Sequence, residues 1–532
     1  MGWPYWIWIV ALPIITSPFV YLIGRFIQRG RDAARGDRDA NLRKRGSAAL
    51  RRAPRPWIAN PVRWVGLAIL VCSYVPLAAA WRDVAAGASL TFSVGIIALK
   101  FDGISLLLSV AVLSLGIMVS IFSGPYIGHE DGQEKYHALL NAMIGAMIGL
   151  GCAADLFNLW VWFETAAVAS YMLVAYHSDR PASLEAGVKY LIQSSMGSML
   201  VLLGIGIIFS QTGTLNLAEL KTVIASGAVS RLLLLAAGTL FCVGFGVKIA
   251  LVPMHTWLPD AHSQAPSGIS AMLSGVVIET GLVALLRSLS VVSDISVGWG
   301  ALLLTFGAVN MLVGNLLALR QTQVKRLLAF SSLSHVGYML LGLGFALSFG
   351  QPEGAQGGVF HLITHAAMKG LAFLAAGCLL FALRLSRGDT EPLISSDLAG
   401  AARRYPVIAF SLSIALLGLG GLPPLAGFMS KWQIFAAGVR SGNPIAIALV
   451  VFAVLNSLLS LGYYAPLVSI MYRNKPSEMV TAGARVPVAM VVPLVLLVIV
   501  VVAFGVWPAL ANGLTGPAGR VVLDIFSKQG GM

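Results

Sequence analysis

Long apolar runs dominate this chain and leave few folds open to it. About fourteen stretches are apolar over the roughly 20 residues that a helix needs to cross a membrane. Because they are apolar nearly all round, they lack the one-sided pattern of helices on a globular core. The sequence therefore predicts an all-α polytopic membrane protein with about fourteen transmembrane helices. They lie near residues 3–25, 61–81, 102–124, 137–153, 155–177, 185–210, 231–258, 268–292, 297–319, 325–349, 356–384, 405–436, 444–472 and 484–510.

Positive charge is concentrated between the first two runs. Residues 25–63 carry 12 Lys and Arg against 3 Asp, in a chain of net charge +14. A short basic loop is typical of the cytoplasmic side, where it also contacts anionic lipid; a nucleic-acid arm is the less favoured interpretation. Fourteen spans then place both termini on the outer side of the cell's inner (plasma) membrane. The later loops agree, since those predicted inside carry Arg320, Arg404 and Arg473, and two outer loops carry only Arg440.

Ionisable residues interrupt the apolar runs. A charge near the bilayer centre costs about 2.5–3.5 kcal/mol on insertion scales. An alternating set of acids, amines and imidazoles therefore favours a pathway for protons or cations over accidental burial. These residues are Glu164, Lys189, Lys248, Glu279, His335, His361 and Lys431, and His365 and Lys369 extend a stripe at i, i+4, i+8 from His361. For any one histidine, a structural role in the core is the alternative.

Two runs are interrupted by proline in a matching way. One reads KIALVPMHTWLPDAHSQAP from Lys248 onward, and the other reads GGLPPLAGFMSK up to Lys431. Proline removes a backbone donor, so each helix should break there, and paired broken helices are typical of inverted-repeat transporters. Simple structural kinks are the alternative. The predicted organisation is N-terminal helices (1–136), two inverted five-helix repeats with breaks in the seventh and twelfth spans (137–292 and 297–472), and a C-terminal helix and tail (473–532).

Redox and metal chemistry find little support in the sequence. The four cysteines are isolated in apolar surroundings, which argues against disulfides, zinc and iron–sulfur ligation. The sequence contains no Walker loop and no GxGxxG motif after a strand, which argues against nucleotide hydrolysis and flavin binding by these motifs. His361 and His365 have a zinc-like spacing, but no third ligand lies nearby in the sequence. We therefore expect no metal and no cofactor in this chain.

Five segments resemble a known family: residues 155–173, 247–275, 325–340, 361–377 and 420–432. They are similar to the antiporter-like proton-translocating subunits of respiratory complex I, of Mrp-type cation/proton antiporters (the D-type subunit) and of membrane-bound hydrogenases, over about residues 100–475. The resemblance implies a fourteen-helix subunit that conducts protons along a central hydrophilic axis and carries no redox centre of its own.

The resemblance also implies roles for single residues. By motif position, Glu164 matches the fifth-helix glutamate and Lys248 the seventh-helix lysine. Because a nearby carboxylate favours the charged form of a buried lysine, separation of this pair would release a proton; a static salt bridge between two helices is the alternative. The other matches are Lys189 near the sixth helix, Lys431 in the twelfth, and His335, His361 and His365 as connecting histidines. His255, Asp260 and His262, past the first break, are a candidate proton uptake site, although capping and loop packing explain them almost as well.

One residue departs from the family pattern. Glu279 stands where relatives usually carry a lysine, and this inverts the charge at the centre of the predicted axis. The carboxyl group could be neutral, could pair with a lysine such as Lys248, or could bind a cation. We expect a hydrated and paired Glu279.

Two functions stay open on the sequence. The first is a proton-translocating subunit of a redox-driven assembly of complex I type (an NADH dehydrogenase) or membrane hydrogenase type. The second is the D-type subunit of a multisubunit Na⁺/H⁺ antiporter. Both require other membrane subunits as partners, and the driving partner would lie on those chains. A stand-alone solute carrier or a structural anchor is less favoured, because neither explains the buried charges.

Overall fold

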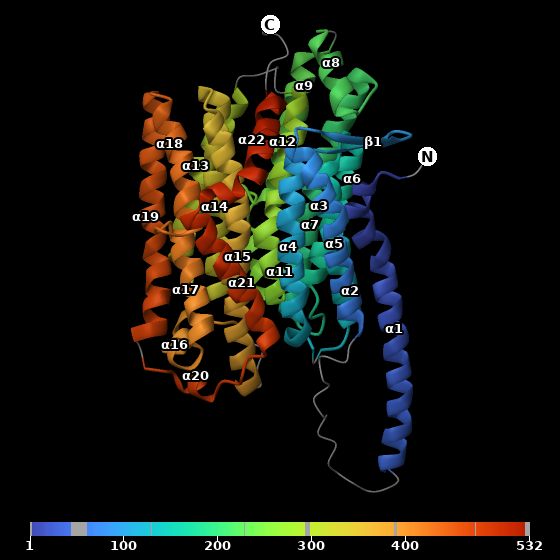
Figure 1. Ribbon diagram of the computed structural model, residues 1–532, viewed down its shortest axis with the longest axis vertical. Coiled ribbons are helices and arrows are strands. Elements are labelled where there is room, and N and C mark those ends of the chain that lie inside the picture. Colours follow the sequence, from blue (N-terminus) through green and yellow to red (C-terminus); the bar gives the residue numbers. More distant parts are fainter. Residues whose placement is uncertain are drawn as a thin grey trace.

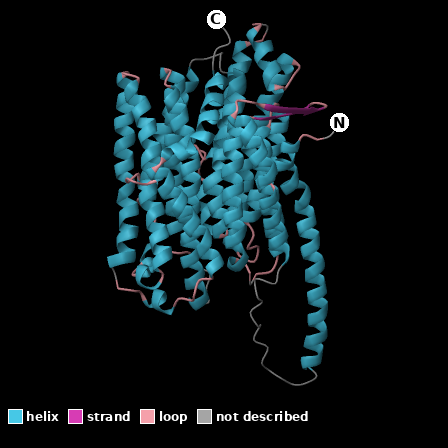
Figure 2. Ribbon diagram, in the orientation of Figure 1, coloured by secondary structure: helices cyan, strands magenta, loops and turns pink. Residues whose placement is uncertain are grey.

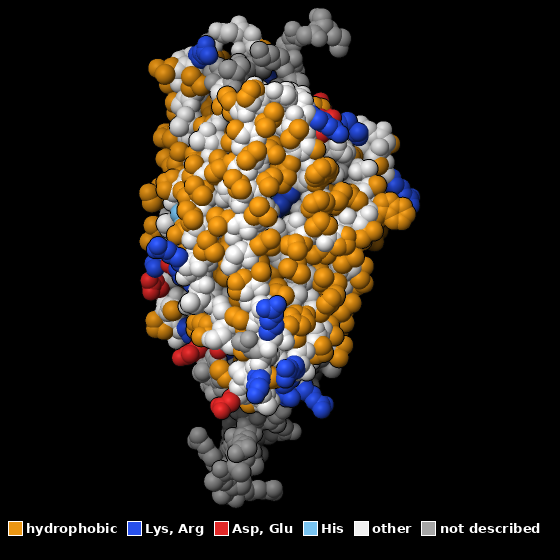
Figure 3. Space-filling model, turned by 90° about the vertical axis from the view of Figure 1, so that its left-hand side faces the viewer, with side chains coloured by type: hydrophobic (Ala, Val, Ile, Leu, Met, Phe, Trp, Pro, Cys, Tyr) orange, Lys and Arg blue, Asp and Glu red, His pale blue; other side chains and the backbone are white. Residues whose placement is uncertain are grey.

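The computed structural model describes residues 3–43, 61–128, 130–227, 229–292, 298–387, 391–473 and 475–526. The described chain is mostly helical, and its long helices run side by side along one axis (Figures 1 and 2). Within these residues, 11 helical segments are long and apolar enough to cross a membrane. Apolar side chains cover most of the middle of the face in Figure 3, and charged side chains gather mainly toward its two ends. The predicted all-α polytopic class is confirmed, and the count of fourteen spans stays a prediction.

The N-terminal part contains four helices and a small, unpredicted hairpin that lies at one end of the bundle (Figure 1). In this hairpin β1 (Leu90–Val94) pairs antiparallel with β2 (Ile97–Phe101). The helices are α1 (Trp8–Arg43, preceded by a 3₁₀ turn at Tyr5–Ile7), α2 (Pro61–Cys72), α3 (Tyr74–Ala85) and α4 (Gly103–Tyr126).

The basic segment 25–63 is not a loop throughout. Helix α1 continues to Arg43, because residues 26–43 are rich in Arg, Ala and other residues that favour helix. The prediction of a loop is therefore wrong for residues 25–43 and for 61–63, which begin α2. Residues 44–60 lie outside the described residues.

The central part of the chain folds into eight helices and a π-helical turn. They are α5 (Gln133–Cys152), α6 (Leu156–Val174), α7 (Pro181–Thr212), α8 (Leu217–Ala225), α9 (Arg231–Ile249), α10 (Trp257–Gln264), α11 (Ser267–Met272), the π turn Leu273–Val277 and α12 (Ile278–Val292).

The C-terminal part repeats the pattern of long helices and one break. It contains α13 (Gly298–Ala318), α14 (Val324–Phe349), α15 (Pro352–Arg387), a 3₁₀ turn at Ser395–Leu398, α16 (Ala401–Arg404), α17 (Pro406–Gly420), α18 (Ala426–Arg440), α19 (Pro444–Arg473), α20 (Glu478–Ala482), α21 (Val488–Val506), a 3₁₀ turn at Pro508–Ala511 and α22 (Asn512–Phe526).

Both predicted breaks are present, and polar side chains of neighbouring helices hold their backbone groups. Between α9 and α10, Asn310 of α13 accepts from the backbone N of Val252 at 2.9 Å and donates to the oxygen of Ala250 at 3.4 Å. Between α17 and α18, Ser457 of α19 donates to the oxygen of Gly420 at 3.0 Å. Irregular backbone at membrane depth requires such partners. The repeat boundaries and the inverted symmetry stay predictions.

The loops predicted to lie inside come together at one end of the bundle. Gln323 pairs with Ile394 in a β-bridge, and the backbone N of Gly400 donates to Ile470 at 3.1 Å. This is the end of α16 and α20 in Figure 1, opposite the hairpin and α8. Pro4 and Asp524, near the two ends of the described chain, line one cavity on the hairpin side. The two ends thus lie on the same side of the bundle, as an even number of spans requires.

Three spans at the centre of the bundle hold five of the nine ionisable residues that were predicted to line the axis. The apolar cores of Ser267–Val292, Val324–Phe349 and Pro352–Arg384 are completely buried inside the protein. They carry Glu279, His335, His361, His365 and Lys369. Because these helices contact only protein on every side, the polar groups on them must find partners within the bundle.

Close packing between the broken halves predicts the effect of one glycine substitution. A Cβ at Gly427 of α18 would lie 1.9 Å from the backbone oxygen of Gly418 in α17, whereas a Cβ at Gly206 of α7 would meet nothing within 4 Å. We expect Gly427→Ala to lower the stability by on the order of 1–3 kcal/mol, the usual cost of overpacking. Thermal unfolding of the detergent-purified protein would measure this. Gly206→Ala is the matched control and should leave the unfolding temperature unchanged or slightly raised; equal effects of both changes would contradict the packing argument.

Candidate functional site

Lys248 lies in the last turn of α9, where it is 3% exposed. Its Nζ donates to the hydroxyl of Tyr190 at 2.7 Å and to Oγ of Ser170 at 3.4 Å. Trp257, the first residue of α10, stacks on the Tyr190 ring at 4.0 Å between centroids and donates to the oxygen of Val247 at 2.7 Å. The segment after the break therefore positions the hydroxyl that binds the lysine.

Glu164 lies on α6 and is half-buried, with its Oε1 buried and without a hydrogen-bond partner. Phe163, its neighbour in the chain, places its ring 5.8 Å from the Nζ of Lys248. Among the described residues, no ion pair joins Glu164 to Lys248. The predicted switch between these two residues stays a prediction, and it requires a movement that brings them together.

Glu279 forms the central acidic contact of the bundle. It lies at the start of α12, next to the π-helical turn, and is completely buried. Its Oε1 is 2.8 Å from Nδ1 of His365 on α15, and its Oε2 has no hydrogen-bond partner. The partner is thus an imidazole and not Lys248, because the Lys248 ammonium points to Tyr190 and Ser170. Lys248 packs against another face of α12, since a Cβ at Gly281, two residues beyond the acid, would lie 3.1 Å from its Cγ.

Three histidines follow Glu279 in a series of neighbouring polar side chains, which we call the buried row. The ring of His335 on α14 lies 5.1 Å from that of His365 and 5.2 Å from that of His361, measured between centroids. Nδ1 of His335 is 3.0 Å from Nε2 of His361, and Nδ1 of His361 is 2.8 Å from Oγ of Ser430. Each imidazole can accept a proton on one nitrogen while the other donates. The structure therefore brings the three predicted histidines into one cluster.

Two buried lysines flank this cluster. Nζ of Lys431, on α18 just beyond Ser430, donates to the oxygen of Leu419 and to Oγ of Ser457, both at 2.9 Å. Lys369, one turn beyond His365 on α15, donates to the oxygen of Leu328 at 2.7 Å and to Ser331.

Lys189 does not belong to the buried row. Its side chain is 48% exposed and pairs with Glu185 at 2.7 Å and with Asp260 at 3.1 Å. Asp260 also binds Arg326 at 2.5 Å, and these residues surround a surface depression at the end opposite the hairpin. The exposure follows from its position near the start of α7, where the chain leaves the apolar layer. As a residue buried in a membrane span, Lys189 was predicted wrongly, but it lies beside the predicted uptake residues.

The two predicted uptake histidines differ in their surroundings. His255 is half-buried in the break before α10, and its Nδ1 has no hydrogen-bond partner. His262 is completely buried on α10 with its ring stacked 4.8 Å from Phe373, and neither ring nitrogen has a partner. The structure separates both histidines from the ion pairs of Asp260. A buried imidazole without a partner is costly, so His262 is a candidate for a role beyond packing.

Sequence reasoning missed several buried cations, among them Lys325 and Arg287. Lys325, the first residue of the predicted span 325–349, is 6% exposed, and its Nζ donates to the oxygen of Ala265 at 2.5 Å. Arg287 on α12 pairs with Asp102 at 2.9 Å, with both side chains almost completely buried. The signal for Arg287 was available, because it interrupts the apolar run 268–292.

Metal ligation has no further basis in the geometry. Across the described ranges, no three His, Cys, Asp or Glu side chains form a group that could hold a metal ion. His361 and His365 each direct a ring nitrogen to a neighbouring side chain, Ser430 and Glu279 respectively. The arrangement is therefore suited to proton exchange between neighbouring groups.

Known proteins are similar to this chain in sequence and in fold. The family described as NADH:quinone oxidoreductase/Mrp antiporter, transmembrane, matches residues 153–460. The F420H2 dehydrogenase subunit N of Methanosarcina mazei is 32% identical over 429 residues, which cover 79% of this chain and 84% of that protein. The NADH-quinone oxidoreductase subunit N of Desulforudis audaxviator is 30% identical and covers 75% and 80% of the two chains. Among solved structures, a chain of the membrane-bound sulfane sulfur reductase, an archaeal respiratory membrane complex, superposes with a TM-score of 0.81 at 27% identity and covers 97% of both chains.

The buried Glu279–His365 contact predicts the effect of removing one partner. His365→Leu leaves the carboxyl group buried without a partner, and breaking a buried pair in this way costs about 3–5 kcal/mol. We expect a marked fall in the thermal unfolding temperature of the purified protein. The double variant Glu279→Leu/His365→Leu, in which neither polar group remains, should recover most of the loss. A double variant less stable than His365→Leu would show that the contact does not account for the effect.

Proposed function

Since the chain belongs to the NADH:quinone oxidoreductase/Mrp antiporter transmembrane family, we propose that it is a proton-translocating subunit of a redox-driven membrane assembly. The assembly would be of complex I type or membrane-hydrogenase type. The observation that carries the proposal is the buried contact series Glu279–His365–His335–His361–Ser430, which ends beside Lys431. A structural anchor would have no use for five adjoining polar groups in its most enclosed helices.

The contact series can pass protons by short transfers. A proton on His365 can move to Glu279 over a 2.8 Å contact. A proton can likewise pass between His335 and His361, whose ring nitrogens are 3.0 Å apart. Histidine suits these steps because its unperturbed pKa of about 6.5 allows it to accept and donate near neutral pH. The Lys248 side chain packs against α12, the helix that carries Glu279, at Gly281, so we assign it the supply of protons from the first half.

The Glu164–Lys248 pair would couple this supply to conformation. Burial disfavours the charged form of a lysine, and a nearby carboxylate favours it. Movement of Glu164 toward Lys248 would thus promote proton uptake by the amine, and movement away would release the proton toward Glu279. The unpartnered Oε1 of Glu164 supports this role, because this oxygen is free to accept from the ammonium.

Proton uptake would begin at the depression around Asp260, Lys189 and Arg326. It lies at the end of the bundle where the basic loops gather, which we assign to the cytoplasmic side by the positive-inside rule. His255 and His262 would extend this uptake site into the bundle. Both termini would then lie on the outer side of the inner membrane. Electron transfer and its cofactors would reside on partner subunits, and this chain would hold none.

The alternative is the D-type subunit of a multisubunit Na⁺/H⁺ antiporter. It is favoured by Glu279, whose buried Oε2 has no partner and offers a carboxylate ligand to a hard cation. The two functions separate in the native assembly. Iron–sulfur or flavin absorbance in the purified complex supports the first, and proton uptake that requires Na⁺ supports the second.

Removal of either member of the proposed switch should stop translocation. In vesicles with the reconstituted assembly, we expect Glu164→Ala and Lys248→Ala to lower proton uptake by at least about tenfold, since proton-transfer groups contribute about 10²-fold or more. Lys135→Ala, at an exposed lysine, is the control and should pump normally. Normal uptake by either assembled switch variant would remove that residue from the mechanism.

Glu279→Gln tests whether the central carboxyl group must exchange protons. Gln keeps the shape of Glu and an oxygen that can accept from His365 Nδ1, but it cannot carry a proton onward. We expect an assembled complex whose proton uptake falls by about tenfold or more. An almost silent substitution would indicate that Glu279 serves only as a structural hydrogen-bond partner.

A further inference from the structure

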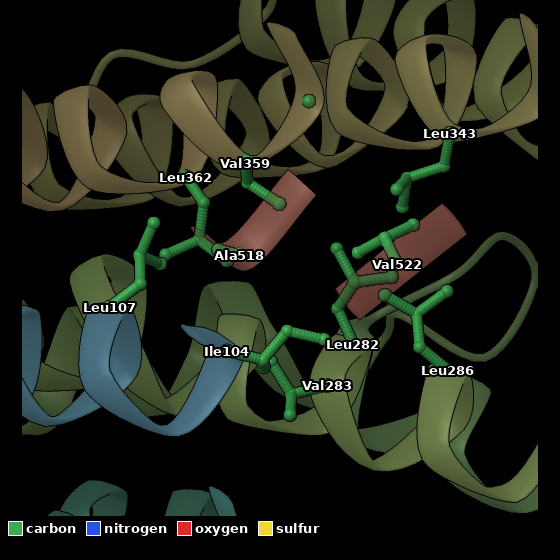
Figure 4. Close-up of a pocket in the computed structure, with 11 residues that line it drawn as sticks. Ile104, Leu107, Leu282, Val283, Leu286, Leu343, Val359, Leu362, Ala518 and Val522 are labelled. Atoms are coloured by element: carbon green, nitrogen blue, oxygen red, sulfur yellow. The ribbon is translucent and has the colours of Figure 1, made fainter. Parts of the chain in front are cut away.

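A wholly apolar cavity lies next to the central contact series. Its lining comes from α4, α12, α14, α15 and α22, whose side chains converge in Figure 4. The volume open to the centre of a water molecule in this cavity is about 20 Å³, so the cavity has room for about one water. The lining side chains include Ile104, Leu107, Leu282, Val283, Leu286 and Val522.

A second, polar cavity opens near the hairpin. The volume open to the centre of a water molecule here is about 750 Å³. The hairpin, α12 and α22 contribute to the lining of this cavity. At its wall, Arg287 donates to Asp102 at 2.9 Å, to Ser105 at 3.1 Å and to the oxygen of Gly151 at 2.6 Å. We refer to this cavity as the hairpin vestibule.

The same helices line the two cavities in succession. Along α12, Glu279 is followed after one turn by Leu282 and Val283 of the apolar cavity, and then by Arg287 and Ser290 of the hairpin vestibule. Along α22, Ala518 and Val522 line the apolar cavity, whereas Val521 and Asp524 line the vestibule. The apolar cavity is therefore the layer that separates the central acid from the vestibule.

Unpartnered polar atoms flank this layer on α12. Oε2 of Glu279 lies before it and Nε of Arg287 after it, and both are buried without a hydrogen-bond partner. Buried polar atoms of this kind call for a partner such as water. A cavity lined only by apolar side chains stays dry at equilibrium, and hydrophobic constrictions gate ion conduction by wetting and dewetting.

We propose that the apolar cavity is a wettable gate between the Glu279–His365 pair and the hairpin vestibule, which gives the chain a proton outlet halfway along its axis. The inference rests on the proposed proton translocation and adds the place where protons leave. In the outlet step, the O–H bond of Glu279 breaks as water in the widened cavity accepts the proton. The carboxylate then regains a proton from the imidazolium of His365. The dry gate prevents return flow from the vestibule.

Matched leucines on α12 test the gate. Leu286 lines the apolar cavity, whereas Leu285 is equally buried but does not line it. In vesicles with the reconstituted assembly, Leu286→Asn should raise the passive proton leak by at least about tenfold, because a polar wall lowers the wetting barrier. Leu285→Asn should leave the leak near that of the unmodified assembly. Equal leaks in the two variants would overturn the gate.

A nearly isosteric pair guards against loss of folding. Val283→Thr adds a hydroxyl to the cavity wall at almost unchanged shape, and Val291→Thr does so at a buried position of α12 outside both cavities. The first should raise the leak and the second should not. If the unmodified assembly translocates protons but Val283→Thr and Leu286→Asn behave like their controls, the outlet is wrong and the proposed function stands. Absence of translocation by the unmodified assembly would overturn both.

Discussion

Burial of the Glu279–His365 contact is the constraint on which the rest of the bundle depends. Both side chains are completely buried, on helices that contact only protein. Such groups persist only where a partner is held at hydrogen-bonding distance. The helices α12 and α15 must therefore keep a fixed register, and α14 must place His335 against the same imidazole. The outer helices isolate this centre from lipid. The buried row of polar side chains therefore depends on the apolar helices around it.

The sequence could predict the runs, the breaks and the types of the site residues, because these depend on local pattern. It could not predict which groups touch. Glu279 meets His365, 86 residues away in the chain, and not Lys248, because α11 and the π turn before α12 pack on α15. Lys189 is exposed because α7 begins outside the apolar layer of the bundle. Hydropathy locates the end of a span only to within several residues, so it could not show on which side of this boundary Lys189 lies. Lys325 and Arg287 were missed as buried cations, although Arg287 interrupts an apolar run as plainly as Lys248 does.

The lysines of the two broken helices have similar surroundings, although one lysine precedes its break and the other follows it. Lys248 precedes its break, in the last turn of α9, whereas Lys431 follows its break and reaches back to the oxygen of Leu419 at the end of α17. Both ammonium groups thus lie at the C-terminal end of a half-helix. The unsatisfied carbonyls and the helix dipole favour positive charge at such an end. Each break therefore supplies a site that favours a buried ammonium group while no carboxylate is in contact with it.

The buried lysines of the site and buried Arg287 have different kinds of partner. Among the described residues, Lys248, Lys369 and Lys431 have only hydroxyl and carbonyl partners, and none forms an ion pair. A neutral partner supports the ammonium without fixing its charge, whereas an adjacent carboxylate would hold the proton in place. An arginine guanidinium carries a permanent charge, and Arg287 pairs with buried Asp102. The permanent charges are thus neutralised at the edge of the row, and the exchangeable protons are left to groups whose neighbours carry no fixed charge.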